Sequence, residues 1–218
     1  MINPNSTWCN KKNGKPYKVW NVGPHTETQE MMVMYENNVG EPYVRPRDLF
    51  LEKFDPIGHE TNGDVQKIMV VVDPQIGFAQ KYPQISNALE SALQAVDDAK
   101  IIYLSWHNQP NSTYEKQLDY HAMMMDDPMA AIALHHQPDM IIQRNTYSGA
   151  KEIIDWFGRN IEVQLCGFEL DACMLATAFG LWDAGIPFVV MSELSGSGVD
   201  RESMKVLYQR QFGKTVWV

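Results

Sequence analysis

Cys173 lies in the stretch LCGFELDACMLATA (residues 165–178), where an apolar run passes into a helical pattern. A cysteine in the first turn of a helix can act as a nucleophile, because the partial positive charge at the helix N-terminus favours the thiolate. With Asp171 as the N-cap, the pattern predicts this position and a lowered pKa for Cys173. The N–H groups of that turn can also bind an oxyanion. The alternative is an inert, buried thiol, which is how we interpret Cys166.

Two charged residues that follow other apolar runs are candidates to assist this thiol. Asp73 ends KIMVVVD, and its carboxylate can serve as general base toward the thiol and then as general acid, or simply cap a loop or helix. Arg144 ends DMIIQR, and its guanidinium can pair with Asp73, stabilise a thiolate or oxyanion, or hold a substrate carboxylate. An arginine cannot shuttle a proton, and the alternative for Arg144 is an ordinary surface or ion-pair residue.

Residues 67–218 alternate short apolar runs with helical patterns, which predicts strands and helices in turn. This alternation is typical of a parallel sheet with helices on both faces. The six expected strands are KIMVVVD, KIIYLSWH, DMIIQR, EVQLCG, PFVVMSE and TVWV. Ligands bind beyond the carboxyl ends of such strands, where the strand order switches. If the order reverses between the first and fourth strands, Asp73 and Cys173 meet at one edge of the sheet.

Residues 1–64 have a different pattern, which predicts a small all-β module without a helix. The runs YKVWNV and EMMVMYE alternate as strands do, around the polar turn GPHTETQ. The stretch GEPYVRPRDLFLEKF predicts a third strand with Pro46 at its end. Residues 55–66 have the composition of a linker. We therefore expect two domains, 1–64 and 65–218.

The composition is that of an ordinary globular protein, with 44% hydrophobic and 21% charged residues. A net charge of −9 argues against a nucleic-acid partner bound through a broad basic face. The N-terminus lacks the apolar segment of a signal peptide, and no apolar run is long enough to span a membrane. The three cysteines, at positions 9, 166 and 173, do not make a disulfide framework. We expect a soluble, cytoplasmic protein with no membrane partner, and the sequence leaves a homo-oligomer open.

Four stretches of the second domain resemble the isochorismatase-like cysteine hydrolases, which include nicotinamidases. The stretches are VVVDPQIGF, DMIIQRNTYSGA, LCGFELDACMLATA and DAGIPFVVMSEL, and the resemblance covers about residues 67–218. It implies a Rossmann-like parallel sheet and a catalytic Asp, Lys and Cys. Asp73 and Cys173 fill two of these places, and Arg144 stands where the family has the lysine.

The same resemblance implies the surroundings of the catalytic residues. Glu169 and Cys173 supply backbone N–H groups to the oxyanion, and the peptide bond between Phe168 and Glu169 is cis. Non-proline cis bonds are rare, so this expectation comes from the resemblance alone. The substrate-binding candidates are four aromatic residues and one polar residue near the expected site: Phe78, Trp106, Tyr147, Phe168 and Gln75.

A metal site is not expected. The stretch SWH at residues 105–107 resembles the Asp-x-His of metal-binding nicotinamidases, but Ser105 replaces the aspartate. His107 is the metal-ligand candidate that remains, and the other histidines of this region have no recognisable ligand spacing. We expect no cofactor.

Residues 8–54 resemble a small bacterial β-domain family of uncharacterised function. The resemblance implies an SH3-barrel-like fold and says nothing about activity. It rests on the motif residues Asn13-Gly14, Tyr17, His25, Glu27-Thr28, Tyr35 and Val44-Arg45-Pro46.

These observations predict a cysteine-dependent hydrolase that acts on an amide (C–N) or related bond of a small molecule through a thioester intermediate. Arg144 at the lysine position raises an alternative, a catalytically silent protein that binds a ligand or a protein partner. Product release from small amides distinguishes the two.

Overall fold

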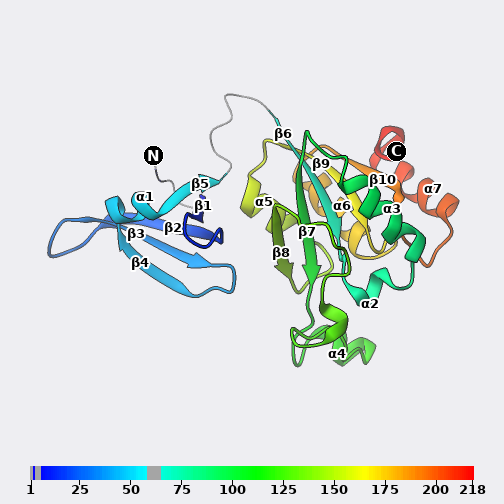
Figure 1. The fold of residues 1–218 in the computed structure, drawn as a ribbon, viewed down its shortest axis with the longest axis horizontal. Helices are drawn as coiled ribbons and strands as arrows, with labels where there is room; N and C mark the ends of the chain where they lie inside the picture. Colours follow the sequence, from blue (N-terminus) through cyan, green and yellow to red (C-terminus); the bar gives the residue numbers. More distant parts are fainter. Residues whose placement is uncertain (1, 3–5, 58–64) are drawn as a thin grey trace. The chain divides into compact units, whose positions relative to one another are not determined.

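The computed structural model describes residues 2, 6–57 and 65–218. The chain divides into two compact units, Met1–Asp64 with Ile153–Gly158, and Val65–Glu152 with Arg159–Val218 (Figure 1). The domain boundary that we expect at residue 64 stays a prediction. Among the described residues, no helix is long and apolar enough to cross a membrane.

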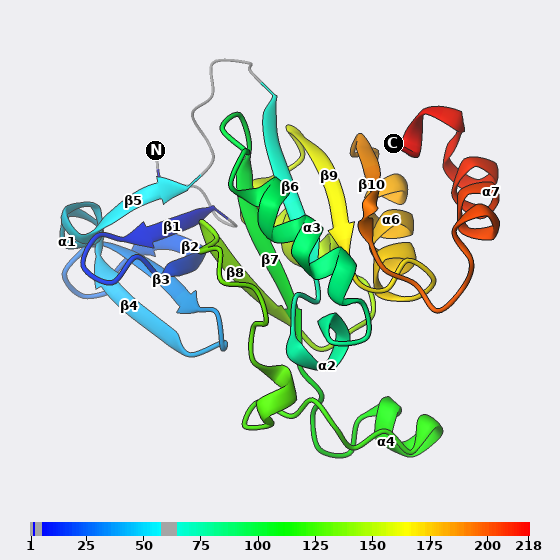
Figure 2. The same ribbon diagram turned by 45° about the vertical axis from the view of Figure 1, so that its right-hand side comes forward.

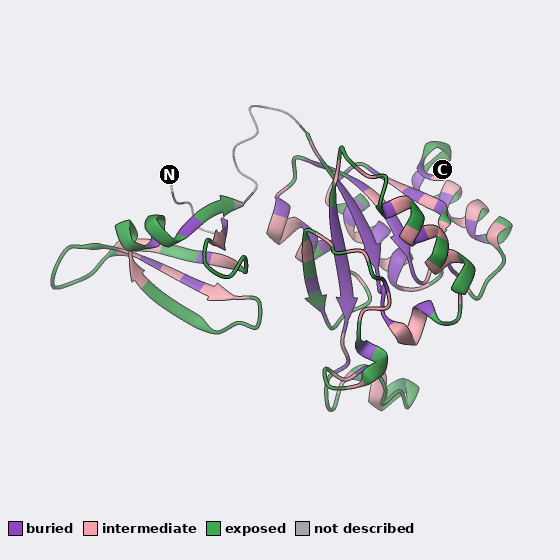
Figure 3. Ribbon diagram, viewed as in Figure 1, coloured by how far each residue is buried: buried purple, intermediate pink, exposed green. Residues whose placement is uncertain are grey.

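Residues 65–218 form a parallel sheet of five strands in the order β10-β9-β6-β7-β8, with every neighbouring pair parallel. The strands are apolar runs rich in β-branched residues, as is typical of strands covered on both faces. Figure 3 shows β6, β7 and β9 buried over most of their length. In chain order the strands are β6 (Gln66–Val72), β7 (Lys100–Trp106), β8 (Met140–Arg144), β9 (Ile161–Gly167) and β10 (Phe188–Ser195).

Helices cover both faces of this sheet (Figure 2). α3 (Pro83–Leu93) buries Leu89 and Leu93 against the apolar side chains of one face, and α6 (Cys173–Asp183) packs on β9 and β10 from the other. The expected parallel sheet with helices on both faces is confirmed. The other helical segments of residues 65–218 are α2 (Ile76–Ala79), α4 (Thr113–Leu118), α5 (Ala150–Phe157), α7 (Arg201–Phe212) and the 3-10 turns η1 (Pro128–Ala130) and η2 (Lys214–Val216).

The sixth strand expected at the C-terminus does not form. The stretch TVWV begins inside the 3-10 turn η2, whose backbone is not extended. Only its last two residues reach β10: Trp217 bridges Val190, and the N–H of Ser192 donates to the carbonyl of Val218 at 2.7 Å. The C-terminus therefore adds a single bridge to the edge of the sheet and no sixth strand.

The first unit contains an antiparallel sheet in the order β4-β3-β2-β1-β5. Its strands are β1 (Thr7–Asn10), β2 (Pro16–Pro24), β3 (Met31–Asn37), β4 (Pro42–Pro46) and β5 (Phe54–Ile57). The sheet buries a small, largely aromatic core made of Trp8, Val19, Val33, Tyr35, Phe50 and Phe54.

The expectation that this unit has no helix is wrong, because Arg47–Lys53 form α1. β4 ends at Pro46, as expected, and the helix then turns Phe50 into the core, where its ring stacks on Phe54 at 4.3 Å. The strands β1 and β5 have four residues each, too few to show alternation in the sequence. Of the linker expected at 55–66, positions 58–64 lie outside the described residues.

Candidate active site

The carboxyl ends of neighbouring strands bring the predicted catalytic residues to one edge of the sheet. Asp73 follows β6, Arg144 ends β8, and Cys173 begins α6 after β9. β6 lies between β7 and β9, so the chain leaves β6 on one side and returns on the other. The expected reversal of strand order between β6 and β9 is confirmed, and such a switch is where ligands bind in sheets of this kind.

Asp73 is completely buried and has a left-handed backbone, with φ at 49°. Residues other than glycine rarely adopt this backbone conformation, and those that do cluster at functional sites. The N–H of Asp73 donates to the carbonyl of Leu104 at 2.8 Å, which ties the turn to β7. The neighbouring strand therefore holds the carboxylate at the end of β6.

One guanidinium nitrogen contacts both oxygens of the Asp73 carboxylate. Nη2 of Arg144 donates to Oδ1 at 2.7 Å and to Oδ2 at 2.8 Å, and both side chains are 0% exposed. Nη1 donates to the carbonyl of Thr146, and Nε has no acceptor among the residues that the structure describes. Burial lowers the pKa of Arg144, but the charges of Asp73 and Cys173 outweigh this effect and raise it. Arg144 is therefore a permanent cation at this site.

Cys173 is the first residue of α6, and its thiol lies close enough to Asp73 and Arg144 for both of them to shift its pKa. The predicted lowering of its pKa is wrong. Burial raises the pKa of the Cys173 thiol, the charge of Asp73 raises it further, and Arg144 opposes both. The residue is only 7% exposed, so the loss of water around a thiolate outweighs the helix terminus and a cation that is shared with Asp73.

The pKa of Asp73 shifts in the same direction. Burial raises it, and the opposing effects of Arg144 and Cys173 do not cancel that rise. A carboxylate whose conjugate acid has a raised pKa is a stronger base. The proton therefore rests on sulfur, and its transfer to Asp73 is easier than transfer to an exposed carboxylate.

The start of α6 differs from the expected cap. The N-cap is Ala172, which makes no side-chain capping bond. The carboxylate of Asp171, predicted as the cap, accepts a hydrogen bond from Oγ of Ser197 at 2.6 Å instead, and so serves the loop after β10. The N–H of Cys173 stands at the first helical position, where donors have no partner within the helix.

The turn before α6 starts at Gly167, whose φ is 106°. A Cβ at this position would lie 2.2 Å from the carbonyl oxygen of Val72, so the close approach of β9 to β6 requires glycine. The peptide bond between Phe168 and Glu169 is cis, as the resemblance implies. The carbonyl of Glu169 accepts from the N–H of Met174 at 3.1 Å, which ties this turn to α6.

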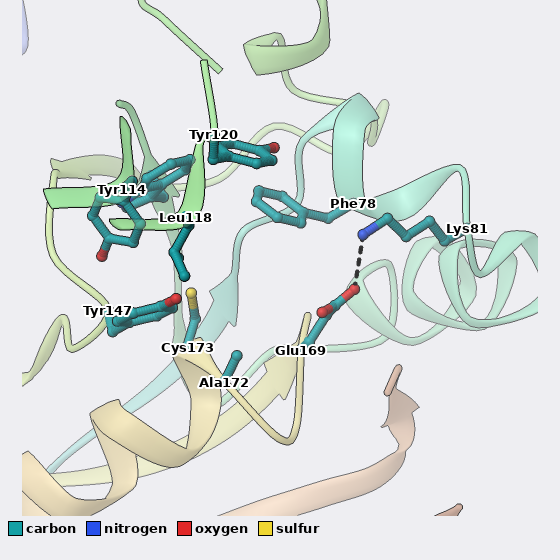
Figure 4. Close-up of a pocket in the computed structure, with 10 residues that line it drawn as sticks. Phe78, Lys81, Tyr114, Leu118, Tyr120, Tyr147, Glu169, Ala172 and Cys173 are labelled. Carbon is teal, nitrogen blue, oxygen red and sulfur yellow. Dashed lines mark hydrogen bonds and ion pairs between the residues drawn. The ribbon is translucent and has the colours of Figure 1, made fainter. Parts of the chain in front are cut away.

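A pocket of about 210 Å³ lies beside Cys173, and half of its lining residues are aromatic. Figure 4 shows the sulfur of Cys173 directed toward the rings. The ring of Tyr114 packs edge-on against Trp106 and Tyr147, with centroids 4.8 Å and 5.0 Å apart. The lining residues are Phe78, Lys81, Trp106, Tyr114, Leu118, Tyr120, Tyr147, Glu169, Ala172 and Cys173.

The pocket includes three of the five predicted substrate-binding residues: Phe78, Trp106 and Tyr147. Gln75 does not reach it, contrary to expectation, because its buried amide accepts from the N–H of Trp106 at 2.9 Å and donates to the carbonyl of the same residue at 2.8 Å. Phe168 does not reach it either, because its ring is buried and stacks on Tyr82 at 5.6 Å. Gln75 instead holds the end of β7, and Phe168 belongs to the core.

Sequence reasoning missed a charged pair in the pocket wall. Nζ of Lys81 lies 3.1 Å from Oε1 of Glu169 and 5.6 Å from the centre of the Phe78 ring (Figure 4). The hydroxyl of Tyr82 donates to the same carboxylate oxygen at 3.2 Å. Lys81 follows the four-residue helix α2, which is too short to leave a periodic signal in the sequence.

The segment around α4 was also missed, although it carries the pocket residues Tyr114, Leu118 and Tyr120. Oγ of Ser112 caps the helix by accepting from the N–H of Glu115 at 3.2 Å. The buried Asn108 ties the segment together, because Oδ1 accepts from Ser112 at 2.7 Å and Nδ2 donates to the carbonyl of Tyr120 at 2.8 Å. The Ser-x-x-Glu spacing is a capping-box signal that predicts this helix start from the sequence.

The surroundings of His107 do not fit a metal site. Nε2 of His107 lies 3.4 Å from Oγ of Ser105, which occupies the place of the family's aspartate, and burial lowers the pKa of the imidazole. Among residues 2, 6–57 and 65–218, no group of three or more His, Cys, Asp or Glu side chains could hold a metal ion. The described side chains near His107 therefore do not form a metal site.

Two family models match the chain. Residues 67–216 match the model described as Isochorismatase domain, and residues 12–62 match the model described as Protein of unknown function (DUF1653). No curated protein matches the chain.

Solved structures of hydrolases share the fold of the second unit. The nicotinamidase PncA from Bacillus subtilis has a TM-score of 0.60 and 16% identity, over 70% of this chain and 99% of that chain. The N-carbamoylsarcosine amidase from Thermoplasma acidophilum has a TM-score of 0.58 and 18% identity, over 68% and 93%. The pyrazinamidase of Pyrococcus horikoshii in complex with zinc has a TM-score of 0.58 and 17% identity, over 70% and 98%. At these identities the likeness establishes the fold alone.

Proposed function

The chain belongs to the isochorismatase family, and we propose that it is a cysteine-dependent hydrolase of an amide (C–N) or related bond in a small molecule. The observation that carries the proposal is the meeting of three buried groups. The thiol of Cys173 lies beside the carboxylate of Asp73 and the guanidinium of Arg144, close enough for both to shift its pKa, and it also lines the pocket. A nucleophile, a base and a fixed cation are the groups that acyl transfer through sulfur needs.

In the first half of the reaction, Asp73 takes the proton of the Cys173 thiol and the sulfur attacks the carbonyl carbon of the substrate. An S–C bond forms, and the carbonyl oxygen becomes an oxyanion. The backbone N–H groups of Glu169 and Cys173 donate to that oxygen. Asp73 then gives its proton to the leaving nitrogen, the C–N bond breaks, and a thioester and an amine or ammonia result.

In the second half, water attacks the thioester carbon and Asp73 accepts the proton of the water. The S–C bond breaks, the acid product leaves, and the proton returns from Asp73 to sulfur. The raised pKa of Asp73 supports its role as the base, because the carboxylate is a stronger base than an exposed one. Arg144 keeps its proton throughout and supplies positive charge.

The pocket supports a small, partly apolar substrate. Its volume of about 210 Å³ and its aromatic wall suit a compact molecule that packs against rings. Phe78, Trp106 and Tyr147 are the residues that we propose contact it, together with Tyr114. The ion pair of Lys81 and Glu169 is the charged feature of the wall.

A catalytically silent binding protein is the second candidate, and one contact favours it. Nη2 of Arg144 contacts both oxygens of Asp73 at once. A carboxylate held in this way is less available to take a proton from Cys173, because each contact with a cation favours its charged form. If that effect dominates, the pocket binds a small molecule without turning it over.

The experiment is a screen of small primary amides, aromatic and aliphatic, with release of ammonia as the measurement. We expect turnover by the wild type, no turnover by Cys173→Ala, and activity retained by Cys166→Ala, a matched control whose thiol lies in β9 outside the pocket. Mass spectrometry of quenched reactions should find the acyl group on the peptide that contains Cys173.

Variants of Arg144 then define the cation. Arg144→Ala should lower the rate constant by about 10²–10³-fold, the scale of one lost stabilising donor. Arg144→Lys should retain activity, because lysine keeps the charge. Turnover that is unaffected by Cys173→Ala contradicts the hydrolase proposal. A wild type that binds these amides saturably without product release supports the silent protein, and Arg144→Lys then tests whether a lysine restores turnover.

A further inference from the structure

A basic hollow in the first unit has no part in the reaction proposed above. Its volume is about 380 Å³, and we call it the basic hollow. It lies between the turn after β1, the strand β4 and the end of α1. Its lining residues are Asn10, Lys11, Lys12, Arg45, Glu52 and Lys53.

Arg45 is the central feature of the basic hollow, and it belongs to the Val-Arg-Pro motif of the first unit. It pairs with the buried Val33 of β3, so its side chain leaves the sheet on the face of the core. Its guanidinium carbon lies 5.7 Å from the centre of the buried Phe54 ring, which orients the group. The position is therefore set by the sheet and by the aromatic core beneath it.

One donor of this guanidinium is unsatisfied. Nη1 of Arg45 is shielded from water and has no acceptor among the residues that the structure describes. A buried donor without an acceptor is costly, and such groups in folded proteins call for an explanation. An oxygen of a bound anion is an acceptor that would satisfy this donor.

The charge around Arg45 favours an anion. Nζ of Lys11 is balanced by the carboxylate of Asp55 at 3.2 Å. Lys12, Arg45 and Lys53 remain, and the lining sets only the carboxylate of Glu52 against them. An excess of positive charge is unusual on a chain whose net charge is −9. Clustered cations in a hollow raise the local concentration of anions.

We propose that the basic hollow binds the phosphoryl group of a small molecule, either inorganic phosphate or a phosphomonoester. The planar fork of Arg45 matches the geometry of phosphate oxygens. The two further cations, Lys12 and Lys53, suit a dianion better than the single charge of a carboxylate. The site lies outside the pocket of Cys173 and gives the module of unknown function a ligand.

The test is a titration of the full-length, ¹⁵N-labelled chain with inorganic phosphate, followed by the backbone amide shifts of Lys11, Lys12 and Lys53. We expect saturable shifts with a dissociation constant of about 1 mM, the scale of a few charge-assisted bonds at an exposed site. Acetate at equal ionic strength should bind at least about ten-fold more weakly. AMP should bind at least as tightly as phosphate, and tighter binding indicates a phosphomonoester as the ligand.

Matched variants separate this site from general charge effects. Arg45→Gln should weaken phosphate binding by about ten-fold or more. Arg47→Gln is the control, because Arg47 lies two positions on and its guanidinium pairs with Asp48 at 2.9 Å outside the hollow. The double variant Lys12→Gln/Lys53→Gln changes only exposed side chains and should weaken binding while the fold is kept.

Several results overturn the proposal. Shifts that rise linearly without saturation indicate screening and no site. Equal binding of acetate and phosphate removes the phosphoryl assignment, and unchanged binding by the double lysine variant removes the site. Binding of an acidic polymer such as polyglutamate, with none of phosphate or AMP, assigns the hollow to a macromolecule instead.

Discussion

Replacing Arg144 by methionine tests the state of the buried ion pair independently of any substrate. Nη2 of Arg144 makes two short contacts to Asp73, and neither side chain is exposed. Methionine fills much of the volume but leaves the carboxylate of Asp73 without its cation. Removal of one partner from a buried ion pair costs about 3–5 kcal/mol. We expect a loss of this size in the free energy of unfolding near pH 7.5, measured by urea denaturation.

The loss should depend on pH in a defined direction. The pKa of Asp73 is raised in the folded chain, and Arg144→Met removes the cation that opposes this rise. A group with a raised folded pKa contributes stability below its unfolded pKa, and this stability is lost as the pH rises through the folded pKa. The penalty of Arg144→Met should therefore be smallest below pH about 4, the unfolded pKa of an aspartate, and grow toward neutral pH.

Two further variants decide the interpretation. Lys67→Met removes an exposed partner of Asp98, whose ion pair has the same separation of 2.7 Å, and should leave the unfolding transition unchanged. The double variant Asp73→Asn/Arg144→Met removes both buried charges and should regain most of the lost stability. The reasoning fails if Arg144→Met is as mild as Lys67→Met, or if the double variant is as unstable as the two single losses added together.

Three other perturbations have expected outcomes. Iodoacetamide should label Cys173 slowly at pH 7 and faster toward alkaline pH, because burial raises the pKa of its thiol. Cys166 in the core should stay unlabelled. Peptide mapping that finds rapid labelling of Cys173 at neutral pH contradicts this expectation. Gln75→Leu should lower the free energy of unfolding by about 1–3 kcal/mol and raise KM, because it leaves the backbone of Trp106 without two hydrogen bonds. Unchanged stability and an unchanged KM would contradict the positioning role of Gln75. Gly167→Ala should lower the free energy of unfolding by about 1–3 kcal/mol or more, because the added Cβ meets a carbonyl oxygen of β6. If the variant unfolds at the same temperature as the wild type, the close approach of the two strands is refuted.

The position of the catalytic candidates could be predicted because Asp73 and Arg144 end apolar runs and Cys173 begins the helix that follows one. Asp73, Arg144 and Cys173 follow strands whose carboxyl ends share one edge of the sheet, and this relation depends only on the alternation of strands and helices. The protonation state of Cys173 could not be predicted in the same way. It depends on how deeply the thiol is buried and on how Asp73 and Arg144 share their charges, and both are tertiary properties.

The pocket wall shows a second limit of the sequence. Phe78, Trp106 and Tyr147 stand next to strand ends or motifs and could be proposed from them. Lys81 follows the short helix α2 and Tyr114 lies in the short helix α4, and the position of these helices relative to the sheet is set by contacts far apart in the chain. The amide of Gln75, which bonds to Trp106 across 31 positions, is such a contact. Sequence patterns locate the ends of strands, and long-range contacts decide which loops reach the pocket.

The departure of Arg144 from the family's lysine is compatible with the proposed chemistry because of how charge moves in the site. At rest the site holds a neutral thiol, a carboxylate and a guanidinium, which sum to zero. After proton transfer it holds a thiolate, a carboxylic acid and the same guanidinium, which also sum to zero. The guanidinium of Arg144 interacts with the charges of both Asp73 and Cys173, so the negative charge moves from oxygen to sulfur without leaving the cation. A buried site tolerates the relocation of a paired charge far better than the creation of an unpaired one, and a fixed cation that never titrates is sufficient for this step.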